Sequence, residues 1–147
     1  MNTLTPLQRL EYTEDIKRLK ARYFRSVDMQ DWVAFAAVFT DDATLEVERS
    51  GGPATIIGSA AIVALVQEYL RGARSVHHGH MPEIHVESAE RATGVWSMED
   101  RLHWSDHRYH GFGHYHERYV RTHEGWRIHY CRLVRISLEH LQAARHP

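Results

Sequence analysis

The sequence feature that most constrains the fold of this chain is a carboxylate among the apolar residues of a predicted strand. Residues 76–86 and 94–104 both alternate with a period of two, and a short turn around Glu90 joins them. We therefore expect two long neighbouring strands of one sheet. On one face of the second strand, Asp100 shares its side with apolar residues, namely Trp96, Met98, Leu102 and Trp104. An ionised carboxylate on an apolar face is costly unless it is paired or used, so Asp100 is the first candidate for a chemical site.

The first helix is predicted by its cap and by its apolar stripe. A capping box with a proline in the first turn is formed by Thr5, Pro6 and Gln8. Apolar residues then recur at helical spacing, at Ile16, Leu19, Tyr23 and Val27. The stripe ends near Asp28, where a carboxylate opposes the helix dipole. Because this unfavourable interaction with the dipole lowers helix stability slightly, we expect Asp28 to have a role other than stabilising the helix.

Two more helices and three more strands complete the pattern. Asp31 is placed to cap a helix over residues 32–39, and Ser59 is placed to cap another that Gly72 ends. Strand-like alternation marks three other segments, at residues 44–48, 108–121 and 126–137.

Helices first and a long meander of strands afterwards are typical of an α+β domain. We expect residues 1–147 to form a single domain, because a chain of this length buries one core. The strands should form a curved, cone-shaped antiparallel sheet wrapped around the three N-terminal helices, with an internal pocket between them. Four glycines would permit the curvature: Gly79, Gly94, Gly111 and Gly113.

Composition indicates which kinds of partner and which cellular compartment to expect. Lys and Arg number 18 against 19 Asp and Glu, so no basic surface favours nucleic acid. Cys131 is the single cysteine, which excludes an internal disulfide and is typical of a reducing compartment. The N-terminus has no signal-peptide pattern and no apolar run reaches membrane-spanning length. We expect a cytoplasmic protein with neither a nucleic acid nor a membrane as partner.

Five separated motifs resemble one known family. They are ARYFRSVDMQDW (21–32), FTDDATL (39–45), VHHGHMPEI (76–84), GVWSMED (94–100) and GWRI (125–128). Together they look like the SnoaL-like branch of the nuclear transport factor 2-like superfamily, over nearly the whole chain. That fold hosts dehydratases, isomerases, cyclases, epoxide hydrolases and non-catalytic subunits. The resemblance therefore implies the fold more specifically than the activity.

Within the superfamily, the pattern is most similar to that of bile acid 7α-dehydratases, with scytalone dehydratases as more distant analogues. The resemblance implies a catalytic set of Tyr23, Asp28, His77 and Asp100. It also implies an arginine from the last strand, for which Arg132 and Arg135 both qualify.

Dehydration of a β-hydroxy carbonyl compound needs a base for the carbon-bound proton, an acid for the leaving hydroxyl and donors for the enolate oxygen. One tyrosine, one histidine and two carboxylates supply these groups without a metal or an organic cofactor. His77 would be the base or proton shuttle, oriented by Asp28 or Asp100. Tyr23 would polarise the carbonyl or assist departure of the hydroxyl.

Each of these residues also has a structural interpretation. Tyr23 could be a plain core tyrosine, Asp28 could bond turn amides beyond its helix, and Asp100 could pair with an arginine. Strict alternation puts His77 and His78 on opposite faces, and a bulge at Pro82 would swap the faces. Only the family pattern favours His77 for the pocket.

A flat hydrophobic substrate would need an apolar lining. Candidates for this lining, or for plain core, are Trp96, Met98, Phe112 and Tyr115, with His78 and the two arginines as polar contacts.

The sequence leaves three functions open. The first is a cofactor-independent dehydratase or isomerase acting on a steroid-like, polyketide-like or aromatic carbonyl compound. The second is a non-catalytic small-molecule-binding module, whose mark would be a site carboxylate neutralised by an arginine with no base left. The third is a metal-dependent enzyme that uses the pairs His78-x-His80 and His114-x-His116. Open sheet faces often pair in the fold that the resemblance implies, so we also expect a homodimer or homotrimer.

Overall fold

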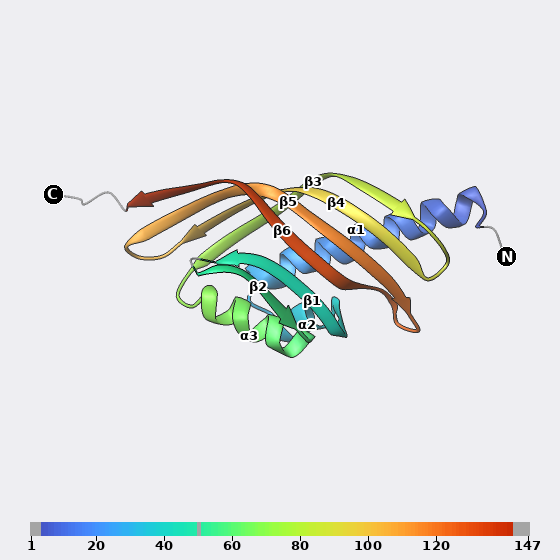
Figure 1. Ribbon diagram of the computed structural model, residues 1–147, viewed down its shortest axis with the longest axis horizontal. Coiled ribbons are helices and arrows are strands. Elements are labelled where there is room, and N and C mark those ends of the chain that lie inside the picture. The colour runs from blue at the N-terminus through green and yellow to red at the C-terminus, as the bar shows by residue number, and fades with distance from the viewer. Residues whose placement is uncertain (1–3, 50, 143–147) are drawn as a thin grey trace.

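The computed structural model describes residues 4–49 and 51–142, which form one mixed six-stranded sheet with three helices (Figure 1). In chain order the elements are α1 (Pro6–Asp28), α2 (Trp32–Ala36), β1 (Phe39–Arg49), β2 (Gly52–Ile57), α3 (Ser59–Tyr69), β3 (Arg74–Val86), β4 (Arg91–His103), β5 (His107–Thr122) and β6 (Gly125–Gln142). We call the sheet face that packs against α1 the inner face, and the opposite one the outer face. The α+β class and the curved sheet are as predicted.

The predicted capping box starts α1. Thr5 Oγ1 accepts from the Gln8 amide at 3.2 Å, and Gln8 Oε1 accepts from the Thr5 amide at 2.9 Å. Asp31 caps α2 through the Ala34 amide at 3.0 Å. The third helix differs from the prediction because Gly58, with a φ of 98°, is its N-cap and Ser59 is already helical. Across 4–49 and 51–142, no helix is both long enough and apolar enough to cross a membrane.

The strand order is β2-β1-β6-β5-β4-β3, and four of the five pairings are antiparallel. The exception is β1 with β6, which run parallel, with Leu45 beside Cys131. The expectation of a purely antiparallel sheet is therefore corrected to a mixed one. Neighbouring segments of the chain predict hairpins, but no local pattern shows which way β1 meets a strand so far along the chain.

A bulge divides β3, as the proline predicted. The register with β4 shifts between His80 and Glu83, and Met81 takes a positive φ of 39°. Before the bulge, Ser75, His77 and Gly79 face inward. Beyond it the inward positions move to even numbers, as at Val86. Regular alternation before the bulge thus places His77 on the inner face and His78 on the outer face.

The core lies between α1 and the inner face. The apolar stripe of α1 is buried, at Tyr12, Ile16, Leu19, Tyr23 and Val27. The helix lies so close to the sheet that a Cβ at Gly79 would come within 2.7 Å of the Phe24 ring. Glycine at this position therefore permits the close approach of α1 to β3.

Candidate active site

Asp28 and His77 form a hydrogen-bonded pair at the C-terminal end of α1. Asp28 Oδ1 lies 2.6 Å from His77 Nδ1. The same carboxylate accepts from the His77 amide at 2.9 Å and from Ser75 Oγ at 2.9 Å. Asp28 thus bonds β3 rather than turn amides beyond its helix. An acceptor at Nδ1 favours the tautomer with its proton there, which leaves Nε2 as a free base.

Asp100 and Arg135 form a second pair on the inner face. Arg135 Nη1 and Nη2 donate to the two carboxylate oxygens of Asp100 at 3.0 and 2.6 Å. Asp100 is 3% exposed. Burial opposes the charge of Arg135, but the hydrogen bonds and charge of Asp100 outweigh it and raise the pKa of Arg135 above its ordinary value. The structure therefore singles out Arg135 over Arg132 as the neighbour of Asp100.

Gly111 makes this second pair possible, because β5 lies between the strands that carry Asp100 and Arg135. Gly111 is the direct neighbour of Asp100 on β5, and a side chain there would collide with both Asp100 and Arg135. We expect Gly111→Ala to separate the pair and to lower the free energy of unfolding by about 1–3 kcal/mol, as overpacking does. Chemical denaturation measures this change.

The matched control is Gly51→Ala, because a Cβ at Gly51 would meet nothing within 4 Å. It should unfold as wild type does. Equal stability of both variants would contradict the arrangement in which the Arg135 guanidinium passes over Gly111 to reach Asp100.

The two pairs are neighbours. His77 on β3 and Asp100 on β4 are direct partners in the antiparallel register. Side chains at such positions share a face and have Cβ atoms about 5 Å apart. A free imidazole nitrogen, two carboxylates and a guanidinium therefore gather in one row across the inner face.

Three tyrosines lie near this row. Burial raises the pKa of Tyr23 and of Tyr115 well above the ordinary value, so both are neutral donors at physiological pH. Their rings contact each other with centroids 5.9 Å apart. Tyr69, at the end of α3, is half exposed, and burial raises its pKa above the ordinary value. The charge of Arg135 opposes this rise and the charge of Asp100 adds to it. The sequence marked Tyr69 only as an apolar helix position, although the last residue of a helix can face a site.

Tyr23 contacts aromatic rings rather than the two pairs. Its ring packs edge-on against Phe24, Phe35 and Phe39 at 5.1–5.9 Å. Within the part of the chain that the structure describes, no hydrogen bond joins Tyr23 to Asp28, His77 or Asp100. The structure thus brings together three of the four predicted catalytic residues and places Tyr23 in the adjoining aromatic layer.

The predicted lining residues divide between the two faces. Trp96, Met98 and Tyr115 are buried on the inner face. His78, Phe112 and Arg132 lie on the outer face, which corrects the expectation that they line an internal pocket. Phe112 follows Gly111 directly, so alternation turns it away from Asp100, and Arg132 lies 4.0 Å from Glu46.

A buried ion pair beneath the site was missed by sequence reasoning. Lys20 Nζ lies 2.5 Å from Glu117 Oε1, and both side chains are fully buried. Tyr119 donates to Glu117 Oε2 at 2.5 Å, and Trp96 Nε1 donates to the Tyr119 hydroxyl at 2.8 Å. The signal was present, because Glu117 alternates with Tyr115 and Tyr119 as Asp100 alternates with its apolar neighbours.

Comparison with known proteins gives the family. The model of the SnoaL-like domain matches residues 8–132. A candidate scytalone dehydratase from Novosphingobium aromaticivorans DSM 12444 superposes with a TM-score of 0.84 at 17% identity, covering 92% of this chain and 91% of that one. The hexachlorocyclohexane dehydrochlorinase LinA-type3 from Novosphingobium barchaimii LL02 gives 0.80 at 20% identity, with 97% of both chains covered.

A variant of Rv3472 from Mycobacterium tuberculosis, a protein of unknown function, gives a TM-score of 0.73 at 27% identity and covers 84% of this chain and 75% of that one. These likenesses agree in fold with the mixed sheet and helices described above. The chain therefore belongs to the family of SnoaL-like domains.

Proposed function

We propose that the protein is a cofactor-independent lyase or isomerase that acts by general acid/base catalysis on a hydrophobic polycyclic carbonyl compound. The observation that carries this proposal is the Asp28–His77 pair beside the Asp100–Arg135 pair on one sheet face. The names of two structural relatives, a candidate dehydratase and a dehydrochlorinase, both describe an elimination, which supports the same class of reaction.

In the proposed reaction, His77 Nε2 removes a proton from the carbon next to the substrate carbonyl. Asp28 holds the imidazole by its Nδ1 atom and stabilises the imidazolium that forms. Negative charge then develops on the carbonyl oxygen, which Arg135 and a neutral tyrosine hydroxyl can stabilise. The imidazolium or a tyrosine next returns a proton, either to the leaving hydroxyl or to another carbon. The first outcome is dehydration and the second is isomerisation.

A non-catalytic binding module is the second candidate, and one observation favours it. Asp100 is neutralised by Arg135, as expected of a site carboxylate in such a module. A binding module would also lack a catalytic base. His77 can serve as a base through Nε2, because Asp28 contacts its Nδ1 atom, and this disfavours the binding module. The catalytic candidate therefore depends on His77 rather than on Asp100.

A panel of β-hydroxy ketones and 3-oxo steroids separates the two candidates. With a chelator present, we expect the enzyme to produce conjugated-enone absorbance in the ultraviolet from one or more members. Compounds that raise Tm without any change in absorbance would instead support the binding module. The control is the same panel with heat-inactivated protein.

A further inference from the structure

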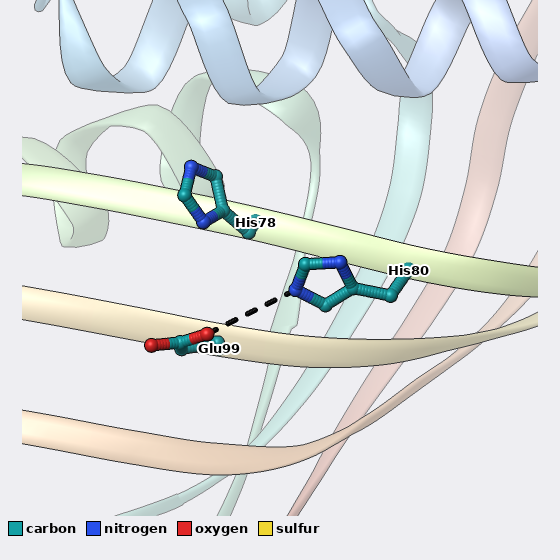
Figure 2. A group of neighbouring side chains, drawn as sticks. All are labelled: His78, His80 and Glu99. Atoms are coloured by element: carbon teal, nitrogen blue, oxygen red, sulfur yellow. Dashed lines mark ion pairs between the residues drawn. The ribbon is translucent and has the colours of Figure 1, made fainter.

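The outer face of the sheet carries a second cluster of chemistry-bearing side chains. His78 and His80 project from β3 and Glu99 projects from the neighbouring strand β4 (Figure 2). His78 and His80 are two residues apart on the outward side of the strand, and Glu99 is the direct partner of His78. Nitrogen and oxygen ligand atoms from these three side chains all lie within 4.8 Å of one another.

From this arrangement we propose that His78, His80 and Glu99 bind a divalent transition-metal ion of the zinc class. Two imidazoles and one carboxylate are a ligand set that zinc and its first-row neighbours accept, whereas Mg²⁺ and Ca²⁺ prefer oxygen ligands alone. Because His78 and His80 are exposed, water can complete the coordination sphere. The site is on the opposite side of the sheet from His77 and is independent of the proposed function.

The carboxylate of Glu99 is held in a position that leaves one oxygen for a metal. Its Oε1 atom accepts from His110 Nε2 at 2.8 Å and from Arg101 Nε and Nη2 at 3.0 and 2.9 Å. Its Oε2 atom faces His80 Nε2 at 3.9 Å. Among the residues described, none donates a hydrogen bond to Oε2. His110 and Arg101 thus act as positioning residues for the ligand carboxylate.

Metal binding requires side-chain movements of about an ångström. Ligand atoms about 2.1 Å from a tetrahedral ion are about 3.4 Å from one another. The 3.9 Å between His80 Nε2 and Glu99 Oε2 must therefore shorten by about 0.5 Å, and the other separations, which are at most 4.8 Å, by at most about 1.4 Å. Rotation of exposed imidazoles achieves this, since such side chains change rotamer readily. The positive charge of Arg101 weakens metal binding but touches only the oxygen that the ion does not use.

A second histidine pair on the same face provides a matched contrast. His114 and His116 are also two residues apart on β5, with ring centroids 6.4 Å apart. Their direct partners are Ser97 and Val95 on β4, and Val134 and Arg132 on β6. No carboxylate occupies these four positions. The structure therefore assigns metal binding to the first pair and not to the second.

The test is isothermal titration of Zn²⁺ into the chelator-treated, desalted, untagged full chain at mildly alkaline pH, where imidazoles are neutral. We expect one site per chain, with at least tenfold weaker binding in each of His80→Gln and Glu99→Gln. His110→Gln should weaken binding by about tenfold, as loss of a partner to a ligand does. The double variant His114→Gln/His116→Gln should bind as wild type does, and Mg²⁺ should give no heat of binding.

Zn²⁺ should also raise Tm of wild type and of the His114→Gln/His116→Gln variant, but not of His80→Gln. Failure of wild type to bind would overturn the proposal. So would equal binding by wild type and His80→Gln, or loss of binding in the His114→Gln/His116→Gln variant alone. Neither the titration nor Tm measures catalysis. The test of the metal site therefore stands even if the proposed lyase or isomerase activity is not found.

Discussion

Glu117→Gln should lower the free energy of unfolding by about 3–5 kcal/mol, because it leaves the ammonium of Lys20 buried without a counter-charge. Both side chains of this ion pair are fully buried, and Lys20 is enclosed by the Tyr23 and Tyr115 rings at 3.9 and 3.7 Å. Water therefore cannot replace the lost partner. Folded domains are stable by about 5–15 kcal/mol, so the loss is a large fraction of the whole. Urea denaturation of wild type and variant measures it.

The matched control is Glu14→Gln. Glu14 pairs with Lys17 at 2.6 Å, but both side chains are about half exposed, so water and salt screen the pair. Its loss should change stability far less. Adding Lys20→Met to Glu117→Gln should restore part of the stability, because no unpaired charge then remains in the core. Wild-type stability of Glu117→Gln alone would contradict an ionised pair in the core.

Asp28→Asn should reduce the turnover of the proposed reaction by about 10²–10⁴-fold while leaving the fold intact. The asparagine oxygen can still accept from the His77 amide, while its NH2 group takes the place of Oδ1, the atom that Ser75 Oγ and His77 Nδ1 contact in wild type. Its amide group can also donate to His77 Nδ1, which would place the imidazole proton on Nε2, where the base is needed. The initial rate on a compound that wild type converts, together with Tm, checks both parts.

Asp31→Asn is the matched control for this variant. Asp31 lies three residues further along and caps α2, a role that asparagine fills equally well. Its rate and Tm should match those of wild type. If Asp28→Asn retains full turnover, the contact between Asp28 and His77 only joins α1 to β3, and the proposed role of the carboxylate is wrong.

Local patterns predicted most of the elements because local physics sets them. The capping box at Thr5 started α1, and Asp31 capped α2. Pro82 marked the bulge that inverts the faces of β3, since proline cannot continue the hydrogen-bond ladder. Alternation singled out Asp100, and its burial on the inner face agrees with that reading.

Long-range contacts were beyond such patterns. The choice of Arg135 depends on Gly111 leaving space across an intervening strand, which no local pattern shows. Glu117 had the same sequence signal as Asp100 but was overlooked, because its partner Lys20 lies on a distant helix. Phe112 was placed with Tyr115 although the two are an odd number of residues apart, so alternation puts them on opposite faces.

The most direct test of the central claim, that His77 is the base, is the rate of conjugated-enone formation by His77→Gln relative to wild type. The compound is the panel member that wild type converts fastest. The matched control is His85→Gln, an exposed outward position on the same strand. We predict a loss of at least about 100-fold for His77→Gln, with unchanged Tm, and a wild-type rate for His85→Gln. Equal rates for wild type and a folded His77→Gln would contradict His77 as the base.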